Sequence, residues 1–128
     1  MKADLEFEEH DGYLSVRIPF CDSVDQAYAY AKSIVQECAA RKFSKVLLDA
    51  LSTPKAPPIM YLYELGVRCA TLPVGHLKVA CVVRPEATYP DRFFENVLQN
   101  RGVNYQWFLD AEQALQWLNE PAPQSGLG

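Results

Sequence analysis

The sequence predicts a single α/β domain with a mainly parallel five-stranded sheet, an N-terminal antiparallel hairpin and helices on both faces of the sheet. First, alternating apolar and polar residues flank an Asp11-Gly12 turn near the N-terminus. Second, short apolar runs then alternate with segments whose apolar residues recur at helical spacing. Third, a length of 128 residues corresponds to about one domain. Because parallel strands need crossover connections, this order favours a parallel sheet covered by helices.

The first expected element is a β-hairpin. An Asp-Gly pair between two alternating runs is typical of a two-residue hairpin turn. Counting outward from this turn pairs Leu5 with Ile18, Phe7 with Val16, and Glu6 with Arg17. The first two pairs share one face and the third lies on the other, so one face is expected to be core and the other solvated.

Apolar spacing and terminal signals place the remaining elements. The strands are expected at residues 45–50, 77–83 and 105–109, and the helices at 23–41, 59–72, 92–101 and after Asp110. Ser23 or Asp22 is available as the first N-cap, and Pro57-Pro58 suits the start of the second helix. Gly102 suits the end of the third helix, and Asp110 has the capping-box spacing to Gln113.

Composition limits the classes of partner. The formal charge is −4, and the twelve basic residues are scattered except for Arg41, Lys42 and Lys45, so no nucleic-acid partner is expected. The first ten residues lack the pattern of a signal peptide, and no apolar run is long enough for a membrane span. We expect a cytoplasmic protein with one domain over residues 1–120 and a flexible tail over 121–128.

The four cysteines point to neither a disulfide framework nor a metal site. Cys21, Cys38, Cys69 and Cys81 are widely spaced and form no C-x-x-C pair. They are expected to be reduced and mostly buried. No metal and no cofactor is therefore predicted.

The segment KVLLDALSTPKAPP, residues 45–58, superficially resembles the phosphoacceptor strand of a response-regulator receiver, which would make Asp49 the acceptor. A receiver also has an acidic pair after its first strand, a hydroxyl residue after its fourth and a lysine after its fifth. Here Arg84-Pro85 follows the fourth strand, Asp110-Ala111 follows the fifth, and the chain opens with a hairpin. A receiver-like phosphoacceptor protein is therefore a further alternative only.

A second resemblance rests on GYLSVRI, KVLLDA, LKVACVV and the ending FFENVLQNRGVNYQWFLDAEQALQWL. These segments are similar to the SpoIIAA-like branch of the STAS superfamily, the domain of anti-sigma-factor antagonists and sulfate-transporter tails. The resemblance covers roughly residues 5 to 119 in element order, and its last third is the most motif-like part.

This resemblance implies a non-enzymatic bacterial regulatory or interaction domain that binds a protein partner. In the antagonists, a serine at the start of the second helix is phosphorylated, and the added charge switches partner binding. Ser52 and Thr53 are the corresponding candidates, although the family's aspartate-serine-serine-glycine signature is absent and prolines follow them. A turn-forming role for both hydroxyls is the alternative.

The second helix is apolar nearly all round. Met60, Tyr61 and Tyr63 lie off the stripe that continues through Leu62 and Leu65, so the helix has more apolar surface than one sheet contact needs. This surplus either packs under a neighbouring helix or forms a face for a protein partner or a homodimer. The alternative is a small apolar or lipid-like ligand, which a sizeable pocket between this helix and the sheet would favour.

The carboxyl edge of the sheet is the other candidate region, because open α/β sheets bind ligands beyond their strand ends. Asp49 and Arg84 are expected in this crevice, where Arg84 could face a small anion or make a surface salt bridge. An enzymatic use of Asp49 with His76 or Cys81 ranks last, since no spacing places these residues together. We therefore expect no enzymatic activity.

Overall fold

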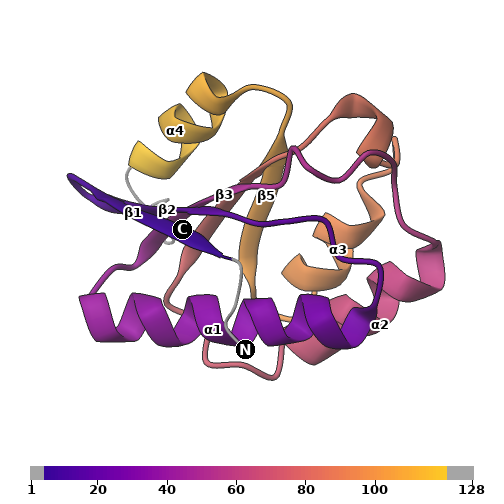
Figure 1. Ribbon diagram of the computed structural model, residues 1–128, viewed down its shortest axis with the longest axis horizontal. Helices are drawn as coiled ribbons and strands as arrows, with labels where there is room; N and C mark the ends of the chain where they lie inside the picture. The colour runs from indigo at the N-terminus through magenta and orange to yellow at the C-terminus, as the bar shows by residue number, and fades with distance from the viewer. Residues whose placement is uncertain (1–4, 121–128) are drawn as a thin grey trace, which may run out of the picture.

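The computed structural model describes residues 5–120, so the tail predicted at 121–128 lies outside the described residues. The strands are β1 (Glu6–His10), β2 (Tyr13–Arg17), β3 (Lys45–Asp49), β4 (Lys78–Val82) and β5 (Asn104–Phe108). The helices are α1 (Val24–Arg41), α2 (Ile59–Cys69), α3 (Phe93–Gln99) and α4 (Ala111–Asn119), with a short 3-10 turn, η1 (Pro85–Ala87). Figure 1 shows the sheet in the middle of the molecule with helices on either side.

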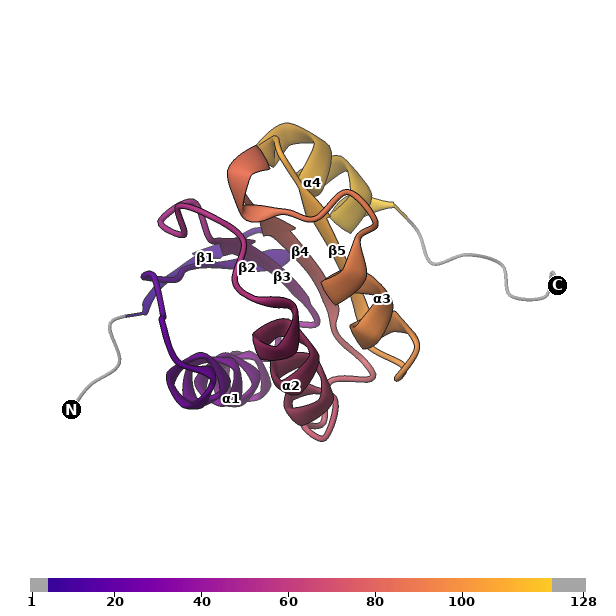
Figure 2. The ribbon, with the colours of Figure 1, turned by 90° about the vertical axis from the view of Figure 1, so that its right-hand side faces the viewer.

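The five strands lie in chain order, β1-β2-β3-β4-β5. β1 pairs antiparallel with β2, and every other neighbouring pair is parallel. When parallel strands are added in one direction through crossovers of one hand, all crossover helices fall on the same face. Accordingly α1, α2 and α3 cover one face, and α4 alone covers the other (Figure 2). The predicted α/β class, opening hairpin and mainly parallel sheet are confirmed.

The hairpin has the predicted register. Glu6 lies opposite Arg17, and Phe7 lies opposite Val16. Gly12 has a φ of +92°, a left-handed conformation that glycine adopts at little cost. The Asp-Gly turn therefore decides which side chains of β2 enter the core, and Leu14 and Val16 are fully buried.

Two apolar cores lie on the two faces of the sheet. The larger core joins the sheet to the α1–α3 layer and includes Leu14, Val46 and Leu98. The smaller core lies under α4 and includes Ala80 and Leu118. Since successive strand residues point to opposite faces, neighbouring residues of β4 and of β3 contribute to different cores.

The helix ends follow local signals in most places. The Ser23 hydroxyl accepts from the Gln26 N–H, and the Asp110 carboxylate accepts from the Glu112 N–H at 2.7 Å. The predicted end of the second helix at residue 72 is wrong, because α2 ends at Cys69. The N–H groups of Thr71 and Leu72 donate three residues back, which tightens the chain into turns instead of continuing the helix.

No helix within residues 5–120 is both long and apolar enough to cross a membrane.

Candidate functional site

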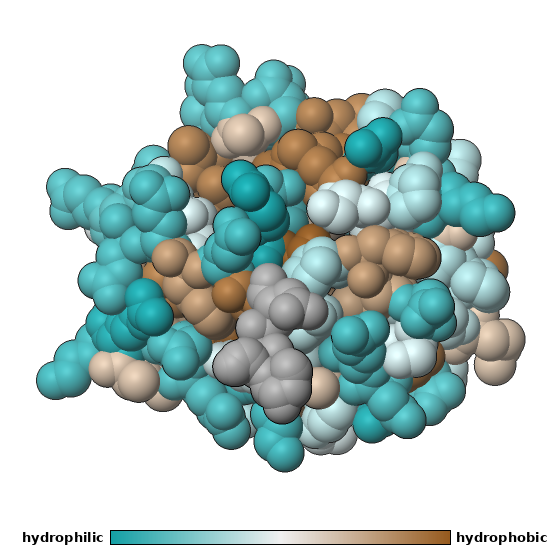
Figure 3. Space-filling view, viewed as in Figure 1, coloured by the Kyte–Doolittle hydropathy of each residue, from teal (hydrophilic) through white to brown (hydrophobic). Residues whose placement is uncertain are grey.

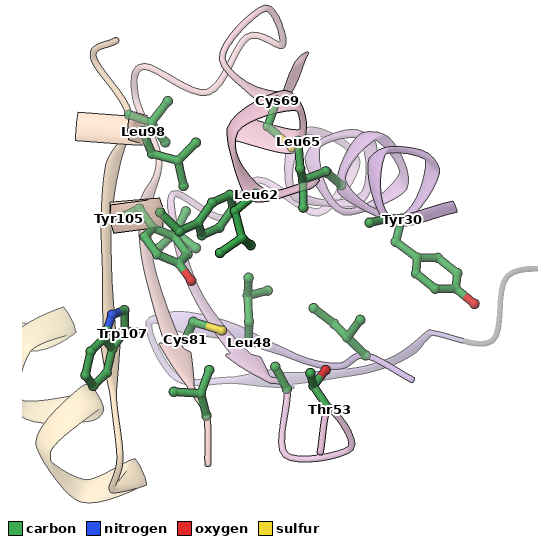
Figure 4. Close-up of a pocket in the computed structure, with 18 of the residues that line it drawn as sticks. Tyr30, Leu48, Thr53, Leu62, Leu65, Cys69, Cys81, Leu98, Tyr105 and Trp107 are labelled. Atoms are coloured by element: carbon green, nitrogen blue, oxygen red, sulfur yellow. The ribbon is translucent and has the colours of Figure 1, made fainter. Parts of the chain in front are cut away.

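A cavity of about 270 Å³ lies between the sheet and the layer formed by α1, α2 and α3. Figure 4 shows Leu62 and Leu65 of α2 on one side of this space, facing Leu48 of β3 and Cys81 of β4 on the other. Most of the lining is aliphatic or aromatic. The cavity therefore lies between the second helix and the sheet, which is the place where a pocket would favour a small apolar ligand.

The cavity exists because α2 spans from α1 to α3 and makes few contacts with the strands beneath it. α2 approaches α3 closely at Gly66, where an added Cβ would lie 2.6 Å from a methyl carbon of Val97. On the α1 side, Ala27 and Ala31 line the cavity with single methyl groups. Small residues at these positions leave space between α2 and the sheet.

The cavity opens at the carboxyl edge of the sheet. Lining residues at the opposite end, such as Leu77 and Val103, are buried, whereas Thr53, Pro57 and Tyr89 are partly exposed. These three lie in segments that follow β3 and β4. This is the edge at which open α/β sheets bind their ligands.

Two tyrosines hold the rim of this opening together. The Tyr61 hydroxyl donates to the Cys21 carbonyl at 3.2 Å, which joins α2 to the segment before α1. The Tyr89 hydroxyl donates to the Pro57 carbonyl at 2.6 Å, which joins the segments that follow β4 and β3. Both hydroxyls are thus used in fixing the mouth of the cavity.

Burial keeps the thiols of Cys69 and Cys81 and the phenol of Tyr105 protonated inside the cavity. Burial raises the pKa of the Cys81 thiol to about 12 and that of the Cys69 thiol to about 11. Burial also raises the pKa of Tyr105 well above 10, with a further contribution from the neighbouring Cys81. Because a thiol reacts as its thiolate, neither cysteine is activated as a nucleophile. All four cysteines are free, as predicted.

Among residues 5–120, Arg92 is the one charged side chain that lines the cavity, and it is already paired. Its guanidinium makes a two-pronged contact with the Glu95 carboxylate, with 2.9 Å between Nη2 and Oε2. It also donates to the Trp107 carbonyl at 3.0 Å and lies 4.0 Å above the Trp107 ring. The lining therefore presents no unpaired charge to a ligand.

The residues predicted for a partner face separate into two groups. Met60 is 72% exposed and Tyr63 is 43% exposed. Tyr61 is instead half-buried and belongs to the cavity rim, as described above. Helical spacing indicated that Tyr61 lies off the apolar stripe, but the helix also meets the segment before α1, which the spacing does not reveal.

Other large apolar side chains are exposed near the same edge. Phe20, Leu51 and Leu109 follow β2, β3 and β5, and Ile59 begins α2. Figure 3 shows apolar side chains gathering at the surface beside α4, while much of the rest of that face is hydrophilic. Together with Met60, these residues give the carboxyl edge an apolar character.

Ser52 and Thr53 lie in the turn that follows β3. Ser52 is exposed, whereas Thr53 is half-buried and lines the cavity near its opening. The Thr53 N–H donates to the Ala50 carbonyl, as expected for a turn. α2 begins at Ile59, six residues after Thr53, so neither hydroxyl belongs to its first turn.

Asp49 and Arg84 shape this turn and do not face the cavity interior. The Asp49 carboxylate accepts from the Leu51 N–H at 3.0 Å and lies 3.7 Å from the Arg17 guanidinium. Arg84 donates to the Leu51 carbonyl at 2.6 Å. The expected surface salt bridge of Arg84 is not found among the described residues, and the guanidinium contact that the structure shows is with a backbone carbonyl.

Asp49 does not come together with His76, and its carboxylate acts on the Cys81 thiol only by helping to raise the pKa of that thiol. Asp49 lies opposite Val82 at the carboxyl end of the sheet, whereas His76 precedes the first residue of β4 at the other end. A strand rises by about 3.3 Å per residue, so roughly 20 Å separates the two ends of this segment. Within residues 5–120, no group of His, Cys, Asp and Glu side chains could hold a metal ion.

Sequence reasoning missed Tyr105 and Arg92 as cavity residues. The apolar run around Tyr105 marks a strand, and only its alternation with Gln106 could have indicated that the ring points into the core. The pairing of Arg92 with Glu95 has the three-residue spacing of a helical ion pair, a signal too common to single out a site.

No family model matches the chain, and no curated protein matches it. Among solved structures, the chain is similar to the NMR structure of the protein TM1081. The two share 14% sequence identity, and the match covers 90% of this chain and 88% of that chain with a TM-score of 0.48.

Proposed function

We propose that this chain is a non-enzymatic binding domain that holds a small apolar ligand in the cavity beneath α2. The observation that carries the proposal is a cavity of about 270 Å³ with a mainly apolar lining and an opening at the carboxyl edge of the sheet. Ligand sites are typically concave, largely apolar and supplied with few polar groups. The protonated thiols and the paired Arg92 fit binding better than turnover.

The size of the cavity supports this proposal. An engineered apolar cavity of about 150 Å³ binds benzene, so this cavity has room for a substituted ring or a short branched chain.

A second candidate function is binding of a protein partner or a second copy through the outer side of α2. The exposure of Met60 and Tyr63, together with Ile59, favours it, because methionine and tyrosine are enriched at interfaces. The resemblance to the SpoIIAA-like domains implies the same kind of role. Regulation by phosphorylation at Ser52 or Thr53 remains part of this candidate.

Mass spectrometry of the purified full chain, under native conditions and again after denaturation, separates these candidates. If the chain holds a small ligand, the native mass should exceed that of the 14.4 kDa chain, and the added mass should disappear on denaturation. A native dimer without added mass would favour the second candidate, and a covalent phosphate that survives denaturation would favour the switch. A bare monomer that also binds no added apolar probe would overturn the ligand proposal.

A further inference from the structure

We propose that the cavity selects an uncharged ligand with an apolar body and one hydrogen-bonding oxygen, and that this oxygen meets the hydroxyl of Tyr105. The inference rests on the proposed ligand-binding function and narrows it to a class of ligand. It would favour phenols, ketones and alcohols of small apolar molecules over carboxylic acids of the same size.

Tyr105 supplies a polar group in the interior of a mainly apolar cavity. It lies on β5 and is 8% exposed, and Figure 4 shows its hydroxyl directed toward Cys81 and the cavity. Phe94 packs edge-on against the ring, with 5.4 Å between the ring centroids, and so holds it in place. The hydroxyl therefore has a defined position before any ligand enters.

The present partner of this hydroxyl is weak. The Tyr105 hydroxyl interacts with the thiol of Cys81, and a thiol is a poor donor and a poor acceptor. A ligand oxygen that replaced the thiol would form a stronger hydrogen bond. The exchange would also leave no strongly polar group unpaired, because the thiol tolerates an apolar environment.

The other hydroxyls of the lining are less suited to this role. Those of Tyr61, Tyr89 and Thr88 each donate to a backbone carbonyl. Their bonds hold the rim of the opening, so recruiting them would loosen the mouth of the cavity. The Tyr30 hydroxyl accepts from the Gln26 side chain and points away from the cavity (Figure 4), and Thr53 lies at the opening. Tyr105 is the group in the interior that can change partner without such a cost.

A charged ligand group is disfavoured by the same lining. Arg92 is the one charged side chain there in the part of the chain that the structure describes, and Glu95 and the Trp107 carbonyl already occupy its guanidinium. A carboxylate buried in this cavity would lose its hydration without gaining an ionic partner. Burial also keeps the pKa of Tyr105 well above 10, so the phenol stays protonated and neutral.

Three matched probes test the inference: propylbenzene, 4-propylphenol and 4-propylbenzoate, titrated calorimetrically into the full chain at pH 7. We expect 4-propylphenol to bind and 4-propylbenzoate to bind at least about tenfold more weakly. The variant Tyr105→Phe should weaken 4-propylphenol about fivefold, the usual worth of one hydrogen bond, and leave propylbenzene within about twofold. Tyr13→Phe, on the opposite face of the sheet, is the matched control and should change neither affinity.

The outcomes distinguish the inference from the function on which it rests. If neither propylbenzene nor 4-propylphenol binds the unaltered protein, both the proposed ligand-binding function and the inference are overturned. If propylbenzene binds but Tyr105→Phe does not weaken 4-propylphenol, or if the benzoate binds as tightly as the phenol, the function stands and the inference is overturned.

Discussion

Glu95 is the only charged side chain within residues 5–120 that is buried, with 4% of its surface exposed. Its carboxylate accepts from the Arg92 guanidinium and from the backbone N–H of Trp107, the latter at 2.9 Å. Arg92 itself has a φ of +56°, an uncommon conformation for a residue other than glycine. The contacts of Glu95 therefore hold the start of α3 against β5 and fix one wall of the cavity.

We expect Glu95→Ala to lower the free energy of unfolding by about 2 kcal/mol, because it leaves the Trp107 N–H and a partly buried guanidinium without their acceptor. Urea unfolding followed by tryptophan fluorescence measures the change. Glu37→Ala is the control, because it removes an ion pair with Arg41 on the surface of α1. Apart from the effect of the altered helix propensity, it should lower the free energy of unfolding by less than about 0.5 kcal/mol. Equal losses in the two variants would show that burial adds nothing to the Glu95 contacts.

At the scale of elements, the position of α2 creates the cavity. Gly66 lets α2 approach α3 closely, and α2 also packs against α1, so the helix spans the space above β3 and β4. Tyr61 ties its first turn to the segment before α1. The cavity is thus a product of helix–helix contacts and not of the sheet itself.

Gly66→Ala tests this arrangement. Alanine favours a helix by about 1 kcal/mol over glycine, but its Cβ would lie 2.6 Å from Val97 Cγ1, and such overpacking costs about 1–3 kcal/mol. We expect a net loss of stability in thermal unfolding. Adding Val97→Ala to Gly66→Ala removes the clash, so the double variant should be less destabilised than the sum of the two single variants. If the stability loss of the double variant equals the sum of the two single losses, the close approach of α2 and α3 at Gly66 is contradicted.

Local signals in the sequence predict the elements but not the spaces between them. The Asp11-Gly12 turn determined the hairpin register, and Ser23 and Asp110 marked two helix starts correctly, because each depends on neighbouring residues alone. The cavity and the partial burial of Tyr61 depend on how α2 sits on α1 and α3. Helical spacing identifies an apolar side but not the distance between that side and the sheet.

At the scale of the whole molecule, the proposed ligand site and the second core lie on opposite faces of the sheet. Successive residues of β3 allow the two faces to be tested separately, since Leu48 faces the cavity and Leu47 faces the opposite core. The same substitution at the two positions therefore acts on the two faces of one strand.

Leu48→Phe should partly fill the cavity. We expect it to raise the free energy of unfolding by about 1 kcal/mol through added apolar burial and to weaken propylbenzene binding at least about tenfold by occupying its space. Leu47→Phe, the matched control, should leave propylbenzene affinity unchanged whatever it does to stability. If Leu48→Phe binds propylbenzene as well as the unaltered protein, the probe does not occupy this cavity.

The most direct test of the central claim is a titration of propylbenzene into the methyl-labelled full chain, followed by NMR. We predict saturable shifts of the leucine methyl signals of Leu48, Leu62 and Leu65, which line the cavity, and no comparable change at Leu47 and Leu118 under α4. Unchanged spectra, or a shift confined to the methyl signal of Met60 on the outer side of α2, would contradict the assignment of this cavity as the ligand site.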